Sequence, residues 1–143
     1  CGAAPVVRRV SHLKSYADYG IFLPIQLAAA SALGSKEDLV KSTVQHYSNR
    51  SKVILHGLTR MGWEVESPGA GASVWTALPA AWRDRGAMAF AEELLRSCGV
   101  VIMPGNLFGE QHKTHVRFAL VAPEHTLQDV LVRIERFLEI GRV

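Results

Sequence analysis

A helical periodicity over about 36–61 constrains this chain more than any other feature of its sequence. Mostly apolar side chains recur there at steps of three or four residues, which places them on one face of an α-helix. They are Leu39, Thr43, Tyr47, Ile54, Leu58 and Met61. Gly62 follows, and glycine commonly ends a helix. A helix of this length extends about 39 Å at 1.5 Å per residue, so the pattern predicts a strut that reaches past a single small core.

The other patterns predict an α+β fold, with helices packed on a small sheet of three or four strands. The predicted helices cover 5–19, 24–33, 86–98 and the end of the chain from Thr126. The predicted strands cover 63–66, 73–78, 100–103 and 115–120. The chain has 143 residues, of which 48% are hydrophobic, and this is enough to bury one core without disulfides or metal.

The segment 24–33 is apolar on nearly every side of its predicted helix. Pro24 is favoured in a first helical turn, and small apolar residues follow it up to Gly34. A helix with this surface needs cover all round. We therefore expect other parts of the molecule, or a partner subunit, to pack against it.

Charge and hydropathy argue against two classes of partner. The net charge is +3, but most Lys and Arg residues alternate with Asp and Glu, which is typical of a solvated surface. The basic residues that do cluster are Arg8, Arg9, His12 and Lys14. No apolar run reaches the length of about 18 residues that a membrane-spanning helix needs. We expect neither nucleic acid nor a membrane as a partner.

The cysteine and histidine residues do not form a metal-binding pattern. Cys1 and Cys98 are too few and too far apart for a disulfide framework or a zinc site, and they favour a reducing, cytoplasmic location. His112 and His115 straddle a loop and a strand, where side chains three residues apart face different ways, and no third ligand accompanies them. We expect no metal.

Arg117 is the residue whose chemistry points most clearly to a function. In the predicted strand 115–120, Val116 and Phe118 share one face, so Arg117 points to the other. A guanidinium in an apolar strand costs free energy unless an anion meets it, and its planar fork suits a carboxylate held by two hydrogen bonds. The pattern leaves three possibilities open: a carboxylate ligand, an ion pair within the chain, or an arginine on a wet sheet face.

The loop 104–109 carries the Pro-Gly signal of a type II turn. It lacks the glycine spacing and the following helix of a nucleotide-binding loop, so we interpret it as a turn. Elsewhere, the sequence has no Ser/His/Asp or paired-carboxylate pattern that would support catalysis. The residues alone therefore predict a carboxylate-binding site without a catalyst.

Three stretches in order resemble a known family. They are Lys14 to Gln26 (KSYADYGIFLPIQ), Pro104 to Gly109 (PGNLFG) and His115 to Leu120 (HVRFAL). Together they are similar to the C-terminal part of the class I/II, fold-type I aminotransferases that depend on pyridoxal 5′-phosphate (PLP). Within that class the chain most resembles the glutamate–pyruvate (alanine) and LL-diaminopimelate aminotransferases. The resemblance covers the whole chain but about the C-terminal third of the family protein.

The resemblance implies roles for several residues. In the family, the arginine matching Arg117 binds the α-carboxylate of the substrate. The segment with Lys14 and Tyr19 lies at the interface of a homodimer, which implies that both line the pocket of the partner subunit. Residues 1–34 would form an interdomain and dimer-interface segment. Residues 35–143 would form the C-terminal small domain, with the helix at 36–61 as its connector.

The resemblance also implies an activity that this chain does not complete. The enzyme would use PLP to transfer an amino group between an amino acid, alanine or glutamate, and a 2-oxo acid. The family's Schiff-base lysine belongs to a Ser-Lys motif that this sequence lacks, and by resemblance it would precede Cys1. We therefore expect no catalytic or cofactor-binding residue here. The chain, cut at Cys1, is expected to be inactive alone and to bind no PLP.

Two other functions are compatible with the residues. A free-standing regulatory domain could sense a carboxylate through Arg117, and an oligomerisation domain could use the apolar segment 24–33. A start codon next to Cys1 would favour the regulatory domain, and upstream coding sequence would oppose it. Sedimentation of the isolated chain would test the oligomerisation domain, because a monomer would leave that domain without a function.

Overall fold

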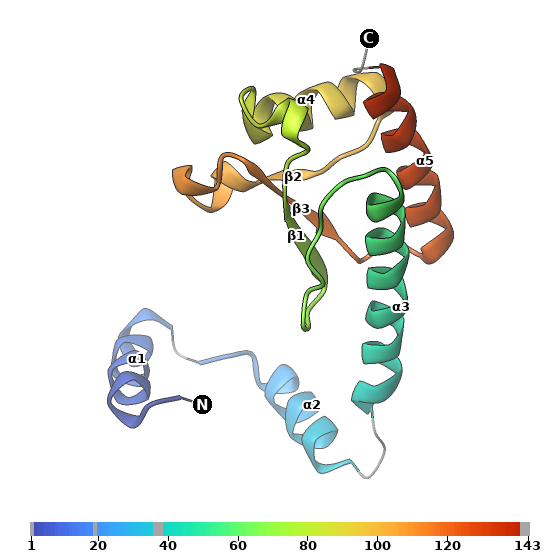
Figure 1. The fold of residues 1–143 in the computed structure, drawn as a ribbon. Coiled ribbons are helices and arrows are strands. Elements are labelled where there is room, and N and C mark those ends of the chain that lie inside the picture. The colour runs from blue at the N-terminus through green and yellow to red at the C-terminus, as the bar shows by residue number, and fades with distance from the viewer. Residues whose placement is uncertain (1, 19, 36–38, 141–143) are drawn as a thin grey trace. The chain divides into compact units, whose positions relative to one another are not determined.

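The fold of the chain is α+β, as predicted, and combines helices with a three-stranded antiparallel sheet (Figure 1). The computed structural model describes residues 2–18, 20–35 and 39–140. The chain divides into two compact units, residues 1–41 and 42–143, and each is described by itself below.

The first unit contains two helices that bury none of their side chains. α1 spans Ala4–Ala17 and α2 spans Leu23–Gly34, and each has a proline in its first turn, where a missing N–H costs nothing. The exposed side chains of α2 include Leu23, Ile25, Leu27 and Leu33. Within the first unit, the apolar side chains of α2 therefore stay exposed. No helix in the described ranges is both long and apolar enough to cross a membrane.

α3 is the long helix that the periodicity predicts, and it spans Leu39–Arg60. The start of the predicted range, 36–38, lies outside the described residues. Gly62 ends the helix with a left-handed φ of +77°. Its N–H donates to the Thr59 carbonyl at 2.9 Å, and the N–H of Trp63 donates to the Leu58 carbonyl at 3.0 Å. This pair of bonds is a Schellman motif, which satisfies two carbonyls that the helix end leaves free.

The sheet of the second unit has the strand order β1-β3-β2, and both pairs are antiparallel. The strands are β1 (Ser73–Ala77), β2 (Met103–Pro104) and β3 (His115–Ala119). Val74 pairs with Phe118, and all of Val74, Val116 and Phe118 are buried. The residues between them in β1 and β3 point to the opposite face, because side chains alternate along a strand.

One hydrophobic core lies between this sheet and the helices α3, α4 (Gly86–Cys98) and α5 (Glu124–Ile140) (Figure 1). Each helix contributes fully buried side chains, namely Ile54 and Leu58 from α3, Phe90 and Leu94 from α4, and Ile134 from α5. α3 and α5 approach closely at Gly57, where a Cβ would lie 2.6 Å from Cδ2 of Leu131. All three helices therefore cover the face of the sheet that carries Val116 and Phe118.

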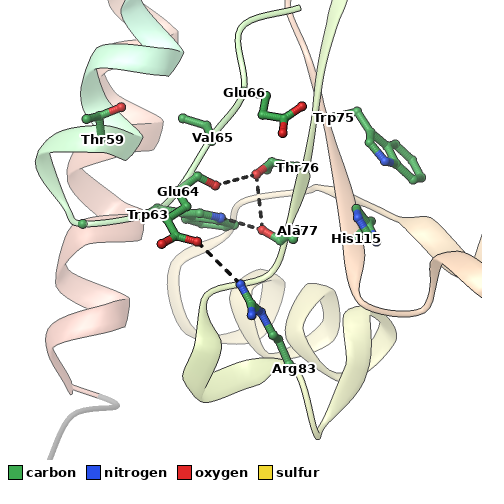
Figure 2. A pocket seen from close by; sticks show the side chains of 11 residues that line it. Thr59, Trp63, Glu64, Val65, Glu66, Trp75, Thr76, Ala77, Arg83 and His115 are labelled. Carbon is green, nitrogen blue, oxygen red and sulfur yellow. Dashed lines mark hydrogen bonds and ion pairs between the residues drawn. The ribbon is translucent and has the colours of Figure 1, made fainter.

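The prediction of a strand at 63–66 is wrong. This segment makes no ladder with β1 and is tied to it through side chains instead. The indole N–H of Trp63 donates to the Ala77 carbonyl at 2.7 Å, and the Thr76 hydroxyl donates to the Glu64 carbonyl at 3.1 Å (Figure 2). Trp63 is buried against Phe90 and Phe118, and its ring rather than its backbone positions the segment.

Two other predicted boundaries need correction. Of the predicted strand 100–103, only Met103 pairs with β3. The observed strand β2 continues to Pro104, which has no N–H to donate and so limits the pairing. α5 begins at Glu124, two residues before Thr126. It begins earlier because the Pro123 carbonyl already accepts a helical hydrogen bond from the N–H of Leu127 at 3.1 Å. The loop 104–109 and its surroundings contain short 3₁₀ turns, which are η2 (Gly105–Phe108) and η3 (Glu110–His112).

Candidate carboxylate-binding site

Arg117 lies in the middle of the central strand, on the face of the sheet opposite the core. Its neighbours across the ladders are Trp75 on β1 and Met103 on β2. Val116 and Phe118 on either side of it are buried, whereas Arg117 is half-buried. The alternation predicted from the sequence is therefore confirmed. The expectation of a guanidinium within apolar surroundings is only partly met, because this face stays accessible.

The guanidinium of Arg117 meets no carboxylate in the described part of the chain. Among the residues that the structure describes, no ion pair or side-chain hydrogen bond involves it. Its Cζ lies 5.8 Å from the centroid of the Phe108 ring. An ion pair within the described part of the chain is thus excluded as the explanation for this arginine, and its five N–H donors are available to a ligand.

Aromatic side chains gather around Trp75, the register partner of Arg117, and we call Trp75, Phe108, His112 and His115 the aromatic cluster. Trp75 is its centre, with ring centroids 5.6 Å from Phe108, 5.2 Å from His112 and 5.6 Å from His115. The His115 ring stacks on Trp75 at 13°, and the other two meet it edge to face. Two members of the cluster, Trp75 and Phe108, thus lie next to Arg117.

No sequence pattern singles out Trp75 or Phe108, and the pattern of the two histidines bears only on a possible metal site. Their rings lie 6.1 Å apart and contact Trp75. Within the described ranges no group of three His, Cys, Asp or Glu side chains is placed to hold a metal. The pairing of Trp75 with Arg117 is the signal that could have indicated the cluster, because both side chains lie on the face of the sheet opposite the core.

The loop 104–109 is built to bring Phe108 to this face. Gly105 is buried, and a Cβ on it would lie 2.6 Å from the His115 carbonyl oxygen and nearer still to that of His112. Gly109 has a φ of +127°, which L side chains rarely adopt. The segment is a turn, as predicted, but it is a 3₁₀ turn over Gly105–Phe108 and not a type II turn, because Gly105 lacks the positive φ that a type II turn needs at the residue after proline.

A groove of about 610 Å³ runs between the 62–66 segment and β1 (Figure 2). Trp75 and His115 of the aromatic cluster line one side of it, and Glu64, Glu66 and Arg83 contribute charge. Glu64 and Arg83 approach to 4.0 Å across solvent-exposed surface. Arg117 does not line the groove, so the groove is a neighbour of the site and not the site itself.

Lys14 and Tyr19, the two other predicted site residues, belong to the first unit. Lys14 is exposed on α1, and its Nζ lies 2.5 Å from Oδ2 of Asp18. This hydrogen bond, and a second one from the N–H of Gly20, lower the pKa of Asp18. Tyr19 lies outside the described residues. The predicted roles of Lys14 and Tyr19 stay predictions.

Comparison with known proteins decides the family. The family model described as aminotransferase class I and II matches residues 2–136. The chain belongs to the class I and II aminotransferases. Among curated aminotransferases, it is 39% identical over 120 residues to the glutamate–pyruvate aminotransferase AlaC of Escherichia coli (strain K12), which covers 84% of this chain and 29% of AlaC. It is 32% identical over 138 residues to the LL-diaminopimelate aminotransferase of Moorella thermoacetica, covering 96% and 35% of the two chains.

Solved structures agree with this assignment. Substrate-bound BacF from Bacillus subtilis matches 95% of this chain and 34% of its own, with a TM-score of 0.80 and 26% identity. The aromatic aminotransferase from Pyrococcus horikoshii matches 82% and 32%, with a TM-score of 0.76 and 25% identity. The predicted family, branch and small-domain fold are confirmed, and the chain corresponds to the C-terminal domain of the family. It spans about a third of the length of these aminotransferases.

Among the described residues of this aminotransferase domain, no lysine fits a PLP site. A lysine that binds PLP covalently must have its ammonium group activated, for example by removal from water. The described lysines, which are Lys14, Lys41, Lys52 and Lys113, are all exposed. In the described ranges, then, no lysine has the surroundings that this cofactor requires, and no step of its chemistry is assigned to these residues.

Proposed function

We propose that Arg117 binds the carboxylate of an amino-acid or 2-oxo-acid substrate. The observation that carries the proposal is its guanidinium, half-buried at the centre of the open sheet face and without an anionic partner among the described residues. Membership of the aminotransferases supports a carboxylate as the missing partner. The whole enzyme would transfer an amino group between an amino acid, alanine or glutamate, and a 2-oxo acid.

The position of Arg117 suits this role. β3 is paired on both sides, so the backbone that carries the arginine is held at a fixed place. A guanidinium fork makes two parallel hydrogen bonds to a carboxylate, which sets the direction of the acid as well as its location. Binding of this kind would orient the Cα of the substrate for reaction, and positioning contributes a large part of many rate enhancements.

The remaining parts of the enzyme lie beyond this chain in the proposal. PLP would supply the electron sink for amino transfer, and residues outside this chain would hold it. The exposed apolar surface of α2 supports residues 1–34 as the interdomain and dimer-interface segment, next to 35–143 as the small domain. Lys14 and Tyr19 would then line the partner subunit's pocket in a homodimer. The cytoplasmic location rests on the cysteine content alone.

The test is steady-state kinetics of the complete enzyme that contains this chain. Arg117→Ala should lower kcat/KM for amino and oxo acids about 30-fold or more, because it leaves the substrate carboxylate without its counter-charge. This corresponds to a loss of about 2–4 kcal/mol of transition-state stabilisation. Arg117→Lys should recover part of this loss, since it keeps the charge and loses the fork. Arg96→Ala is the matched control, because Arg96 is an exposed arginine on α4. Unchanged kinetics in Arg117→Ala would remove this residue from the site.

A further inference from the structure

The loop 104–109 places an aromatic ring on the protein surface next to Arg117. Phe108 is 48% exposed, so hydrophobic burial does not account for its position. Its ring lies within the roughly 6 Å range in which a guanidinium is attracted to the negative face of an aromatic ring. Phe108 is therefore placed where it can act on the arginine.

The ring of Phe108 is held in this position from two sides. Trp75 meets it at 5.6 Å with an interplanar angle of 81°, and Trp75 is itself stacked on His115. The loop backbone is fixed at Gly105, which packs against the carbonyls of His112 and His115. Because Trp75 and Arg117 are register partners, this bracing and the arginine belong to the same part of the sheet.

We propose that Phe108 is a positioning residue that holds the guanidinium of Arg117 ready for a carboxylate. The inference rests on the proposed function, in which Arg117 binds that carboxylate. The ring attracts the cation but accepts no conventional hydrogen bond, so the N–H donors of the guanidinium stay available. Met103, the other register neighbour of Arg117, is an apolar side chain that also leaves these donors to the ligand.

The energetic benefit is preorganisation. An arginine side chain has many rotamers, and a ligand that must first order it binds more weakly. With Phe108 in place, that ordering precedes binding. The aromatic cluster also replaces water on one side of the arginine. The lower dielectric there strengthens the attraction between the guanidinium and a bound carboxylate.

The experiment uses the 143-residue chain, labelled with ¹⁵N-arginine, and pyruvate as the probe. The Nε–Hε resonance of Arg117 is identified by its loss in Arg117→Ala, and the backbone amide spectrum checks that each variant is folded. Phe108→Leu keeps an apolar side chain and removes the ring. We expect it to move the Arg117 resonance and to weaken pyruvate binding about fivefold, or about 1 kcal/mol at 1.4 kcal/mol per tenfold.

Phe108→Trp should restore the affinity, because tryptophan is the strongest cation–π partner. Leu107→Ala, at a 60% exposed position of the same loop, should leave both the resonance and the affinity unchanged. Unchanged pyruvate affinity in Phe108→Leu would overturn the inference, and so would a loss that Phe108→Trp does not restore. If Arg117→Ala itself binds pyruvate normally, the proposed function fails, which is a different result.

Discussion

Replacing Gly105 by alanine tests how the loop 104–109 is packed. The φ of Gly105 is not positive, so alanine can adopt its backbone conformation, and the cost is purely steric. The added Cβ would lie 2.6 Å from the His115 carbonyl oxygen, whereas a carbon and an oxygen in favourable contact are about 3.3 Å apart or more. The second clash is with the His112 carbonyl, and neither backbone atom can rotate away.

The magnitude follows from two opposing effects. Overpacking in a close-packed region costs about 1–3 kcal/mol. Alanine recovers about 0.4–1 kcal/mol, because it reduces the conformational entropy of the unfolded chain. Two backbone oxygens clash with the new Cβ, which puts the cost in the upper half of its range, so the free energy of unfolding should fall by about 1–2 kcal/mol.

Urea denaturation of the 143-residue chain, followed by tryptophan fluorescence, measures this change. With a slope of about 2 kcal/mol per molar urea, the midpoint should fall by about 0.5–1 M. Gly69→Ala is the control, since nothing lies within 4 Å of its Cβ position and its φ is not positive. The control should keep or slightly raise the midpoint. Equal midpoints for the two variants would refute the reasoning.

Three other outcomes are expected. Trp63→Phe should lower the free energy of unfolding by about 1 kcal/mol in urea, because it removes the 2.7 Å hydrogen bond to Ala77 and keeps a ring against Phe90; no change would contradict this role of the indole. Folding lowers the pKa of Asp18, so the ion pair of Asp18 with Lys14 stabilises α1 at pH values above the ordinary pKa of aspartate. This stabilisation is lost as the pH falls through the lowered pKa. An NMR titration should find that Lys14→Gln raises the pKa of Asp18, and an unchanged value would exclude Lys14 as the cause. The isolated chain mixed with PLP should give only the absorbance of the free cofactor and transfer no amino group, and a stoichiometric lysine adduct would disprove this.

The sequence predicts the helices and the orientation of Arg117 well, because both follow from local periodicity. The three-to-four-residue spacing up to Met61 defines α3, and the alternation around Arg117 places it opposite the core. The segment 63–66 shows the limit of this reasoning. It alternates like a strand, yet the indole of Trp63 decides its position through a contact fourteen residues away.

The aromatic cluster is not predictable from such patterns. Phe108 and His112 come from 3₁₀ turns, and their positions depend on the close approach at Gly105 and the left-handed Gly109. Trp75 joins them only through the register of β1 with β3. These are contacts between distant segments, so the sequence could indicate the arginine but not its surroundings.

The central claim is that Arg117 binds the substrate carboxylate, and a crystal structure of the complete enzyme with a bound amino-acid substrate tests it most directly. The account predicts that both carboxylate oxygens lie within about 3 Å of the Arg117 guanidinium nitrogens, with the ring of Phe108 beside them. A carboxylate held by another residue, with Arg117 turned away from it, would contradict the account.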